Sequence, residues 1–386
     1  MGHILILMLA PFAFATGAYV FSGLLGPMSA DVGVSVAAAA QLQTAFTIAC
    51  AVGGPLLAIA TARLDRRKLL LGVLVFLAVA NALSALTQGF GMLMGVRIAA
   101  GFIGALTLPV ASAMAVMLVA PERRAVALAA ILAGNSLAFL VGIPVGSFIG
   151  ASFGWASSFW FAAALCLGVA ILILVRIPAT DAPPRPPKDA MRTALRWPLT
   201  GLMGVTLLAF TATFSTVGLI GPVVTASTGL TGAAIGWMQA LIGIGSIFGL
   251  AVGARLASSA ERPLPMLVAG ILVTQVIFGY AILFPAPGPV GVAMIGVAIA
   301  VGAACLFACA PVIQTRLGAG AGPSATIAFA FNGSMIFLGQ GLGTAIGGAA
   351  TSLLGLWSVG VSGAVVAVFG VLLATRNLTI SGSSRV

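Results

Sequence analysis

Arg97 is the charged residue whose position most directly suggests chemistry. It is the seventh residue of the apolar stretch 91–119, whereas the other sixteen Lys and Arg residues lie at or beyond the ends of such stretches. An arginine at the centre of a membrane-spanning helix costs about 2.5 to 3.5 kcal/mol, so a bundle retains one where it faces a partner or a watery cavity. We expect Arg97 to line a cavity and to serve substrate or ion coupling. The alternatives are an arginine that reaches the outer interface or binds backbone carbonyls.

Uncharged polar and aromatic side chains in the apolar stretches could bind a solute by hydrogen bonds and stacking. The candidate substrate contacts are Tyr19, Gln43, Asn135, Thr211, Gln239, Phe331 and Asn332. A mostly apolar cavity with such groups suits a small amphipathic or modestly polar molecule better than a multiply charged one. Each side chain could instead form a hydrogen bond that packs two helices together.

Titratable acids are missing from the same stretches. All six Asp and Glu residues fall outside them, and the single His is residue 3. Proton coupling usually needs a titratable group within the spans, with a pKa shifted by burial or by a neighbouring charge. Asp31, in the loop after the first stretch, could serve only if that helix end dips inward. Coupling therefore uses Asp31 or Asp65, is weak, or is absent.

Metal, cofactor and enzyme chemistry are not indicated. Cys305 and Cys309 share a helix face, but no histidine is near enough in sequence to complete a metal site. The apolar stretches also lack paired carboxylates, a histidine cluster, or a nucleophile with a base. We predict that the chain is not an enzyme and binds neither a metal ion nor a cofactor.

The composition identifies the class of protein. A hydrophobic fraction of 61% with only 6% charged residues excludes a soluble globular domain. We predict an all-α polytopic membrane protein with twelve transmembrane helices, the first of which is retained and not cleaved. The predicted helices are 4–26, 37–61, 69–88, 91–119, 125–150, 155–177, 198–226, 231–257, 264–284, 289–315, 323–349 and 353–375.

The positive charges predict the topology. When the connecting loops are counted along the chain, the even-numbered loops and the tail hold sixteen of the 17 Lys and Arg residues, and the odd-numbered loops hold none. Cytoplasmic loops of membrane proteins carry such an excess, so we expect both termini in the cytoplasm. The net charge of +11 then indicates contact with anionic lipid, not with nucleic acid.

The chain divides into two similar halves. The only long polar break, 179–196, is rich in proline and charge and is predicted to be a cytoplasmic linker. It separates a six-helix bundle at 1–178 from a second at 197–375, followed by a tail at 376–386. The string GLLGP at 23–27 returns as GLIGP 195 positions later, and Ala-Arg-Leu after the second helix recurs after the eighth, which indicates a duplicated unit.

This 6+6 arrangement resembles the major facilitator superfamily, and so does the loop after the second helix. The family pattern there is G-x-L-a-D-r-x-G-r-r; Asp65 and Arg66 match its core, while Thr61 replaces the leading glycine and the second glycine is absent. The resemblance implies that Asp65 latches an inner gate, supported by Arg66 and Arg67. The alternative is a carboxylate that only balances local charge.

Two further strings resemble family motifs. R-I-A-A-G-F-I-G-A, beginning at Arg97, resembles the helix 4 pattern R-x-x-q-G-x-g-a-A, whose arginine is associated with proton or substrate coupling. Gly142, Pro144 and Gly146 resemble the antiporter motif of drug:proton efflux members, although Ile143 separates its Gly-Pro pair. The resemblance implies a gating role for these three residues and favours efflux. The alternative is close packing between the two halves.

The predicted function is export of a small amphipathic or modestly polar solute, drug-like or sugar-like, by alternating access. The resemblance implies an inner-membrane location, proton antiport and a monomer, with protons and membrane lipid as further partners. The alternative is an uncoupled facilitator, or an importer of a sugar or organic anion with Arg97 as its counter-charge.

Overall fold

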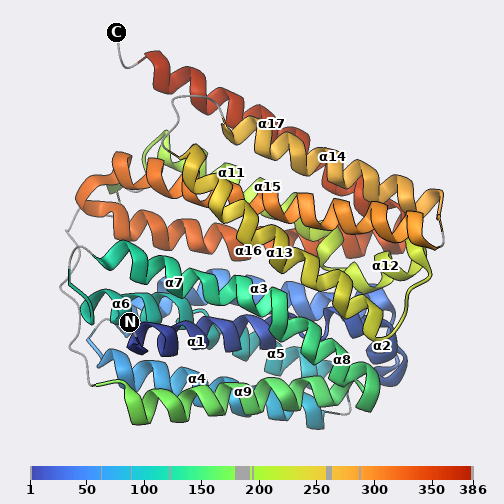
Figure 1. The fold of residues 1–386 in the computed structure, drawn as a ribbon, viewed down its shortest axis with the longest axis horizontal. Helices are drawn as coiled ribbons and strands as arrows, with labels where there is room; N and C mark the ends of the chain where they lie inside the picture. Colours follow the sequence, from blue (N-terminus) through green and yellow to red (C-terminus); the bar gives the residue numbers. More distant parts are fainter. Residues whose placement is uncertain are drawn as a thin grey trace. The chain divides into compact units, whose positions relative to one another are not determined.

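The structure is a computed structural model that describes residues 2–61, 63–87, 89–120, 123–178, 192–193, 195–257, 263–286 and 288–383. These residues are almost entirely helical, and no strand occurs among them (Figure 1). The chain forms two compact units. The first comprises Met1–Arg185 and Gly232–Gly243, and the second comprises Pro186–Thr231 and Ile244–Val386. Most of the predicted linker lies outside the described residues.

The first unit consists of helices joined by short connections. Its elements are α1 (Gly2–Tyr19), η1 (Ser22–Leu24), α2 (Leu25–Val32), α3 (Val36–Ala60), α4 (Arg66–Leu86), α5 (Phe90–Gly104), α6 (Thr107–Met117), α7 (Arg124–Leu137), η3 (Ala138–Gly142), α8 (Ile143–Phe153) and α9 (Trp155–Arg176). The first part of α13 (Ala233–Leu256) also belongs to it.

The second unit contains the rest of α13 together with the remaining helices. These are α11 (Leu199–Val217), α12 (Ile220–Thr228), α14 (Pro263–Leu283), α15 (Pro289–Ala321), η4 (Gly322–Ser324), α16 (Ala325–Leu354) and α17 (Ser358–Ser383). Within this unit α11 packs against α16 and α17, and α14 packs against α15 and α17.

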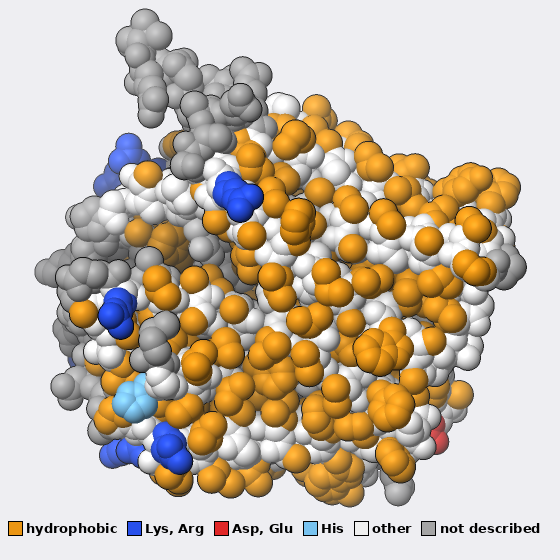
Figure 2. All heavy atoms as spheres, in the orientation of Figure 1, with side chains coloured by type: hydrophobic (Ala, Val, Ile, Leu, Met, Phe, Trp, Pro, Cys, Tyr) orange, Lys and Arg blue, Asp and Glu red, His pale blue; other side chains and the backbone are white. Residues whose placement is uncertain are grey.

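Eleven helical stretches of the described chain are long and apolar enough to cross a membrane. The predicted eleventh span corresponds to α16, which has 30 residues and would extend about 45 Å at 1.5 Å per residue. It is not one of the eleven, and its apolar residues are interrupted by Asn332, Gln340 and several glycines. Figure 2 shows a surface covered mainly by hydrophobic side chains, as contact with lipid requires.

The first span is interrupted, although its sequence predicts one continuous helix. Helix α1 ends at Tyr19, and the chain passes through η1 and resumes as α2, which ends at Val32 before the left-handed Gly33 (φ 72°). Pro27 lacks an amide hydrogen and its ring excludes a helix that continues through the preceding turn, but the first turn of α2 accepts it. Asp31 therefore lies on a helix and not, as expected, in a loop.

The same interruption recurs in the second unit. Helix α11 ends at Val217, and the short helix α12 follows and ends before the left-handed Gly229 (φ 75°). The residues that precede the two short helices have closely similar backbone angles, φ −113° and ψ 14° at Leu24 against φ −119° and ψ 27° at Leu219. The repeated strings GLLGP and GLIGP thus fold alike, as a duplicated unit requires.

The predicted fifth span is also irregular. It consists of α7, a π-helical turn at Ala138–Gly142, and α8. Pro144 cannot donate the hydrogen bond that a regular helix would need, and the amide of Ile143 instead donates to the carbonyl oxygen of Ala138, five residues earlier. The wider turn therefore accommodates the proline without ending the helix.

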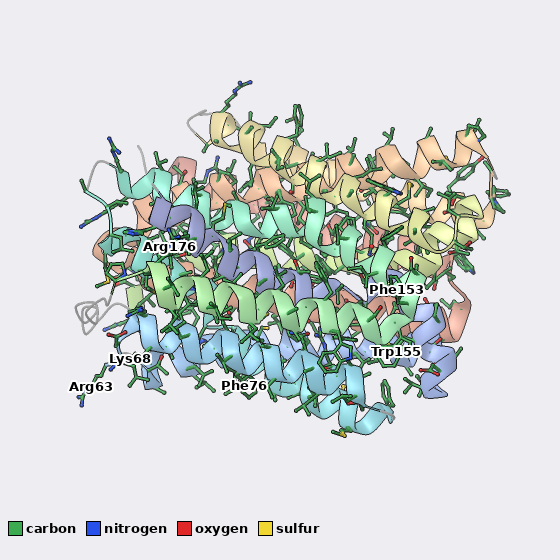
Figure 3. The ribbon with its side chains drawn as sticks, turned by 60° about the horizontal axis from the view of Figure 1, so that its bottom comes forward. Arg63, Lys68, Phe76, Phe153, Trp155 and Arg176 are labelled. Atoms are coloured by element: carbon green, nitrogen blue, oxygen red, sulfur yellow. The ribbon has the colours of Figure 1, made fainter. Side chains whose placement is uncertain are left out.

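The two ends of the first unit differ in chemistry. Figure 3 shows the side chains of Arg63, Lys68 and Arg176 at one end of its helices, and Phe153 and Trp155 at the other. Helices α4 and α9, which carry most of these residues, lie side by side. The cations are therefore gathered at one end of this helix pair, as expected for a protein oriented by its positive charges.

Candidate functional site at the interruption of helix α1

The end of α1 leaves four backbone carbonyls without partners inside the helix. The carbonyl of Thr16 accepts a hydrogen bond from the amide of Val20 at 2.9 Å. The carbonyl of Tyr19 accepts one from the hydroxyl of Ser22 at 2.8 Å. Local groups therefore satisfy the first and the last of the four carbonyls.

Arg97 satisfies the other two. From α5 its Nη1 donates to the carbonyl oxygen of Gly17 at 3.0 Å, and its Nη2 donates to that of Ala18 at 2.7 Å. A helix C-terminus carries partial negative charge, so a cation is stabilised there as well as hydrogen-bonded. The planar guanidinium meets two adjacent carbonyls at once, which the point charge of lysine could not do.

Aromatic rings enclose the guanidinium. Its carbon lies 4.2 Å from the ring centroid of Phe46, 4.8 Å from that of Phe21 and 5.9 Å from that of Phe159. These cation–π contacts partly replace the hydration that Arg97 loses, because its side chain is only 1% exposed. Arg97 thus joins α5 to the end of α1 inside the unit. Its guanidinium binds backbone carbonyls, which was one of the alternatives to lining a cavity.

Three of the predicted substrate contacts in the same unit are Tyr19, Gln43 and Asn135. The ring of Tyr19, the last residue of α1, lies 5.2 Å from that of Phe139. Gln43 on α3 is 2% exposed, and neither the nitrogen nor the oxygen of its amide has a hydrogen-bond partner among the described residues. A buried amide without partners costs free energy, so a bound solute or water would stabilise it. Asn135 is half-buried on α7.

Gln239 binds the α1 interruption from α13. Its Nε2 donates to the hydroxyl of Ser22 at 2.8 Å, and its Oε1 accepts from the hydroxyl of Ser147 on α8 at 2.8 Å. All three side chains are buried. Gln239 was predicted from the sequence and the two serines were not, because only their partners distinguish them from ordinary helix serines.

The glycines of the antiporter-like motif pack directly on α1. A Cβ at Gly142 would lie 2.0 Å from Thr16 Oγ1, and one at Gly146 would lie 2.1 Å from Val20 Cγ2. A side chain fits at these two positions only if Thr16, Val20 or the helices themselves shift. The motif therefore holds α8 and its π turn against the end of α1 within the first unit, and Pro144 lies between the two glycines.

Asp65 begins α4. It is the N-cap residue, and its carboxylate accepts a hydrogen bond from the backbone amide of Lys68 at 2.8 Å. The exposed amides at a helix start favour an anion, so this contact stabilises the turn. The latch role implied by the family resemblance is not visible in this contact.

The two arginines after Asp65 bind carbonyls near helix C-termini. Arg66 Nη1 donates to the carbonyl of Thr61, the C-cap residue of α3, at 3.2 Å. Arg67 Nη2 donates to the carbonyl of Leu174, in the last turn of α9. With Arg97, three arginines of this acid-poor chain therefore bind the negative ends of helices.

Asp31 lies at the end of the unit opposite to the cations. From the last turn of α2 its Oδ2 accepts a hydrogen bond from Nε1 of Trp155, the first residue of α9, at 2.7 Å. The side chain is otherwise exposed, so it is accessible to protons. This bond joins the ends of α2 and α9.

The remaining predicted contacts belong to the second unit. Asn332 Oδ1 accepts from the hydroxyl of Thr206 at 2.8 Å, which joins α16 to α11. Thr211 donates to the carbonyl of Leu207 in its own helix, and Phe331 is half-buried. The structure therefore gathers Arg97, Tyr19 and Gln239 at the α1 interruption. The other three residues, Asn332, Thr211 and Phe331, belong to the second unit.

A buried glutamine in the second unit was missed. Gln275 on α14 accepts a hydrogen bond from the hydroxyl of Thr216, near the end of α11, at 2.5 Å. Its signal in the sequence is that it is the single amide side chain in the predicted stretch 264–284. Both helix interruptions are therefore supported by a glutamine.

Known proteins resemble this chain in sequence and in fold. Its residues 7–317 match the family model of the Major Facilitator Superfamily. A chloramphenicol resistance protein of Streptomyces lividans is 36% identical over 276 residues, which are 69% of each chain. The inner membrane transport protein YdhP of Escherichia coli K12 is 30% identical over 372 residues, covering 95% of this chain and 94% of YdhP.

Solved structures show the same fold at low identity. A bacterial homologue of the human lysosomal transporter Spinster, in an inward-facing and unoccupied conformation, gives a TM-score of 0.76 at 15% identity and covers 98% of this chain and 96% of its own. The human organic anion transporter MFSD10 gives 0.65 at 17% identity, with 96% and 97% covered. The chain is a multi-pass membrane transporter of the inner-membrane type, and it belongs to the major facilitator superfamily.

Proposed function

We propose that this transporter exports a small, uncharged, amphipathic solute that forms a few hydrogen bonds, as chloramphenicol does. The observation that carries this proposal is the 36% identity to a relative named as a chloramphenicol resistance protein. The same relative supports export, because resistance to a drug follows when the drug leaves the cell.

The chemistry of the first unit supports a neutral solute. Both Nη atoms of Arg97 already donate to carbonyls, so its charge is not available as the main partner of an anion. Gln43, by contrast, has an amide without partners that could bind a hydroxyl or amide of a solute. An importer of organic anions, which would use Arg97 as counter-charge, is less well supported.

We propose roles for the other candidate residues from their contacts and from the family motifs that contain them. Side chains that would contact the solute together with Gln43 are Tyr19, Asn135, Thr211, Phe331 and Asn332. Arg97 would transmit movement between α5 and α1, because it binds the last turn of α1 directly. Asp65, Arg66, Arg67, Gly142, Pro144 and Gly146 would serve the gating movement.

Proton antiport is the proposed source of energy, with Asp31 as its first candidate. Asp31 is the only acid in the candidate spans of the described chain, and its side chain is exposed. Asp65 is the second candidate. A second candidate function is a facilitator that only equilibrates its solute. It is favoured because the sole acid of these described spans lies in the last turn of its span.

Orientation, partners and oligomeric state follow from the sequence pattern. We propose that both termini face the cytoplasm, because the cations gather in the loops on that side. Those cations would bind anionic lipid headgroups. The protein is proposed to work as a monomer.

The test uses purified protein in liposomes with radiolabelled chloramphenicol. We impose a pH gradient of either direction and compare chloramphenicol movement with that in protein-free liposomes. Uphill movement against the direction of proton flow supports antiport, and equilibration without any effect of the gradient supports the facilitator. No movement above protein-free liposomes would contradict chloramphenicol as a substrate.

A further inference from the structure

The first part of α13 is bound to the first unit at its point of interruption. The residues Gly232–Gly243 cluster with this unit, whereas the rest of the helix clusters with the second. One continuous helix is therefore shared between two compact units. Any movement of one unit relative to the other must act on the contacts of this first part.

Those contacts include a chain of three hydrogen bonds. Ser147 donates to Gln239, Gln239 donates to Ser22, and Ser22 donates to the carbonyl of Tyr19, each at 2.8 Å. The chain runs from α8 through α13 to the last carbonyl of α1. Every donor and acceptor in it is uncharged, and a bond of this kind contributes only about 0.5 to 1.5 kcal/mol net.

Glycines allow the helices to approach closely along this contact. A Cβ at Gly23 would lie 3.0 Å from Gln239 Oε1 and 3.1 Å from Ser147 Oγ. A Cβ at Gly236 would lie 3.1 Å from the carbonyl oxygen of Pro144. At these two glycines α13 thus approaches backbone and small or polar side chains.

The corresponding glutamine of the first half behaves differently. Gln43 is the eighth residue of α3 and Gln239 is the seventh of α13, so the two occupy similar positions in the two halves of the sequence. The amide of Gln43 has no partner among the described residues, whereas that of Gln239 is bound on both sides. The chain of hydrogen bonds is therefore not a general consequence of the repeated fold.

We propose that Gln239 is a releasable latch. It holds the first part of α13 on the α1 interruption in one conformation of the transport cycle, and its bonds to Ser22 and Ser147 break in the other. Gln239 is then a positioning residue that acts through Ser22 on the end of α1, where Arg97 binds, and not a contact of the solute. This role rests on alternating access, which the proposed export also requires.

The first test measures backbone hydrogen exchange by mass spectrometry on the full chain in lipid nanodiscs, without any solute. Gln239→Ala should raise the exchange of residues 16–24 and 232–243 by about 5- to 30-fold, the effect of losing one or two bonds of this strength. Ser147→Ala should have a smaller effect, and adding it to Gln239→Ala should change little, because both variants break the same chain. Unchanged exchange in Gln239→Ala would overturn the proposal.

The matched control is Gln275→Ala. Gln275 is equally buried and also loses a hydrogen bond, but to Thr216 within the second unit. It should raise exchange near α11 and α14 and leave residues 16–24 and 232–243 as in the parent protein. An equal rise there in both variants would mean a general loss of stability and would contradict the latch.

The second test asks whether the contact must open. A Cβ at Gly236 would lie 3.4 Å from Ser147 Cβ, close to the 3.5 to 4.5 Å of disulfides, so Gly236→Cys with Ser147→Cys should form one on oxidation. The oxidised pair should slow exchange of residues 16–24 and 232–243 relative to its reduced form and should stop chloramphenicol movement until a reductant is added. Equal exchange and equal movement in both forms would show a permanent contact and refute the latch.

The control pair lies within the second unit. A Cβ at Gly370 would lie 3.5 Å from Leu208 Cβ, so Gly370→Cys with Leu208→Cys should also form a disulfide. Its oxidation should leave transport unchanged. If the parent protein does not move chloramphenicol, the proposed substrate fails, whereas the exchange comparison still decides the latch.

Discussion

Arg97 Nη2 lies 2.7 Å from the carbonyl oxygen of Ala18, although 79 residues separate them in the chain. This contact turns a buried charge into the cap of an interrupted helix. The two hydrogen bonds reduce both the cost of burying the cation and the cost of leaving the carbonyls unpaired. The contact therefore ties the end of α1 to α5.

Replacement of Arg97 should therefore affect both stability and transport. Arg97→Ala leaves the carbonyls of Gly17 and Ala18 unpaired, at about 1 to 3 kcal/mol each. Arg97→Lys keeps the charge but loses the paired geometry, so we expect an intermediate loss of thermal stability and strongly reduced flux. Thermal unfolding in detergent and flux in liposomes check this order. If lysine matched arginine in both, the two-carbonyl contact would be unimportant.

Gly142→Ala should separate α8 from α1. Its Cβ would lie 2.0 Å from Thr16 Oγ1, and overpacking of this kind costs about 1 to 3 kcal/mol. Thr16→Ala removes that oxygen and should partly restore thermal stability and flux. The matched control is Gly168→Ala on α9, whose Cβ would meet nothing within 4 Å and which should be neutral or slightly stabilising. Equal behaviour of the two glycines would contradict the close packing.

Asp65 can be tested for capping and gating separately. Asp65→Asn keeps an oxygen for the amide of Lys68 and should preserve folding. Asp65→Ala removes the cap and should lower stability by about 0.5 to 2 kcal/mol. Under the proposed gating role, Asp65→Asn impairs flux at unchanged thermal stability. Full flux in Asp65→Asn would leave capping as the role of this residue.

Asp31→Asn should remove proton coupling while keeping the bond to Trp155, because the asparagine oxygen can still accept it. We expect loss of pH-driven uphill movement and retention of downhill flux. Trp155→Phe serves as the control, since it removes the donor and leaves the carboxylate. Uphill movement that persists in Asp31→Asn would direct attention to Asp65.

Hydropathy was sufficient to predict where the long helices lie, because the lipid selects apolar segments long enough to span it, whatever their partners. The interruption at Tyr19 was not predicted, since an apolar string with Gly23, Gly26 and Pro27 is equally compatible with a kinked helix. The π turn before Pro144 was missed for a similar reason: a proline indicates a disturbance but does not select its form.

The candidate site was predictable in its members more than in its contacts. Arg97 is conspicuous in sequence because it is the one cation inside an apolar stretch. Its partners are backbone carbonyls, and these carry no signature in side-chain identity. Ser22 and Ser147 were overlooked because their importance comes from Gln239, a residue far away along the chain.

The order of synthesis gives the Arg97 contact a further consequence. The carbonyls of Gly17 and Ala18 emerge from the ribosome well before Arg97, so the acceptor is present in the membrane when the arginine has to enter it. A prior partner lowers the cost of inserting a charged helix. Membrane insertion of α5 should thus depend on α1, and a truncated chain without α1 should retain Arg97 at the surface of the bilayer.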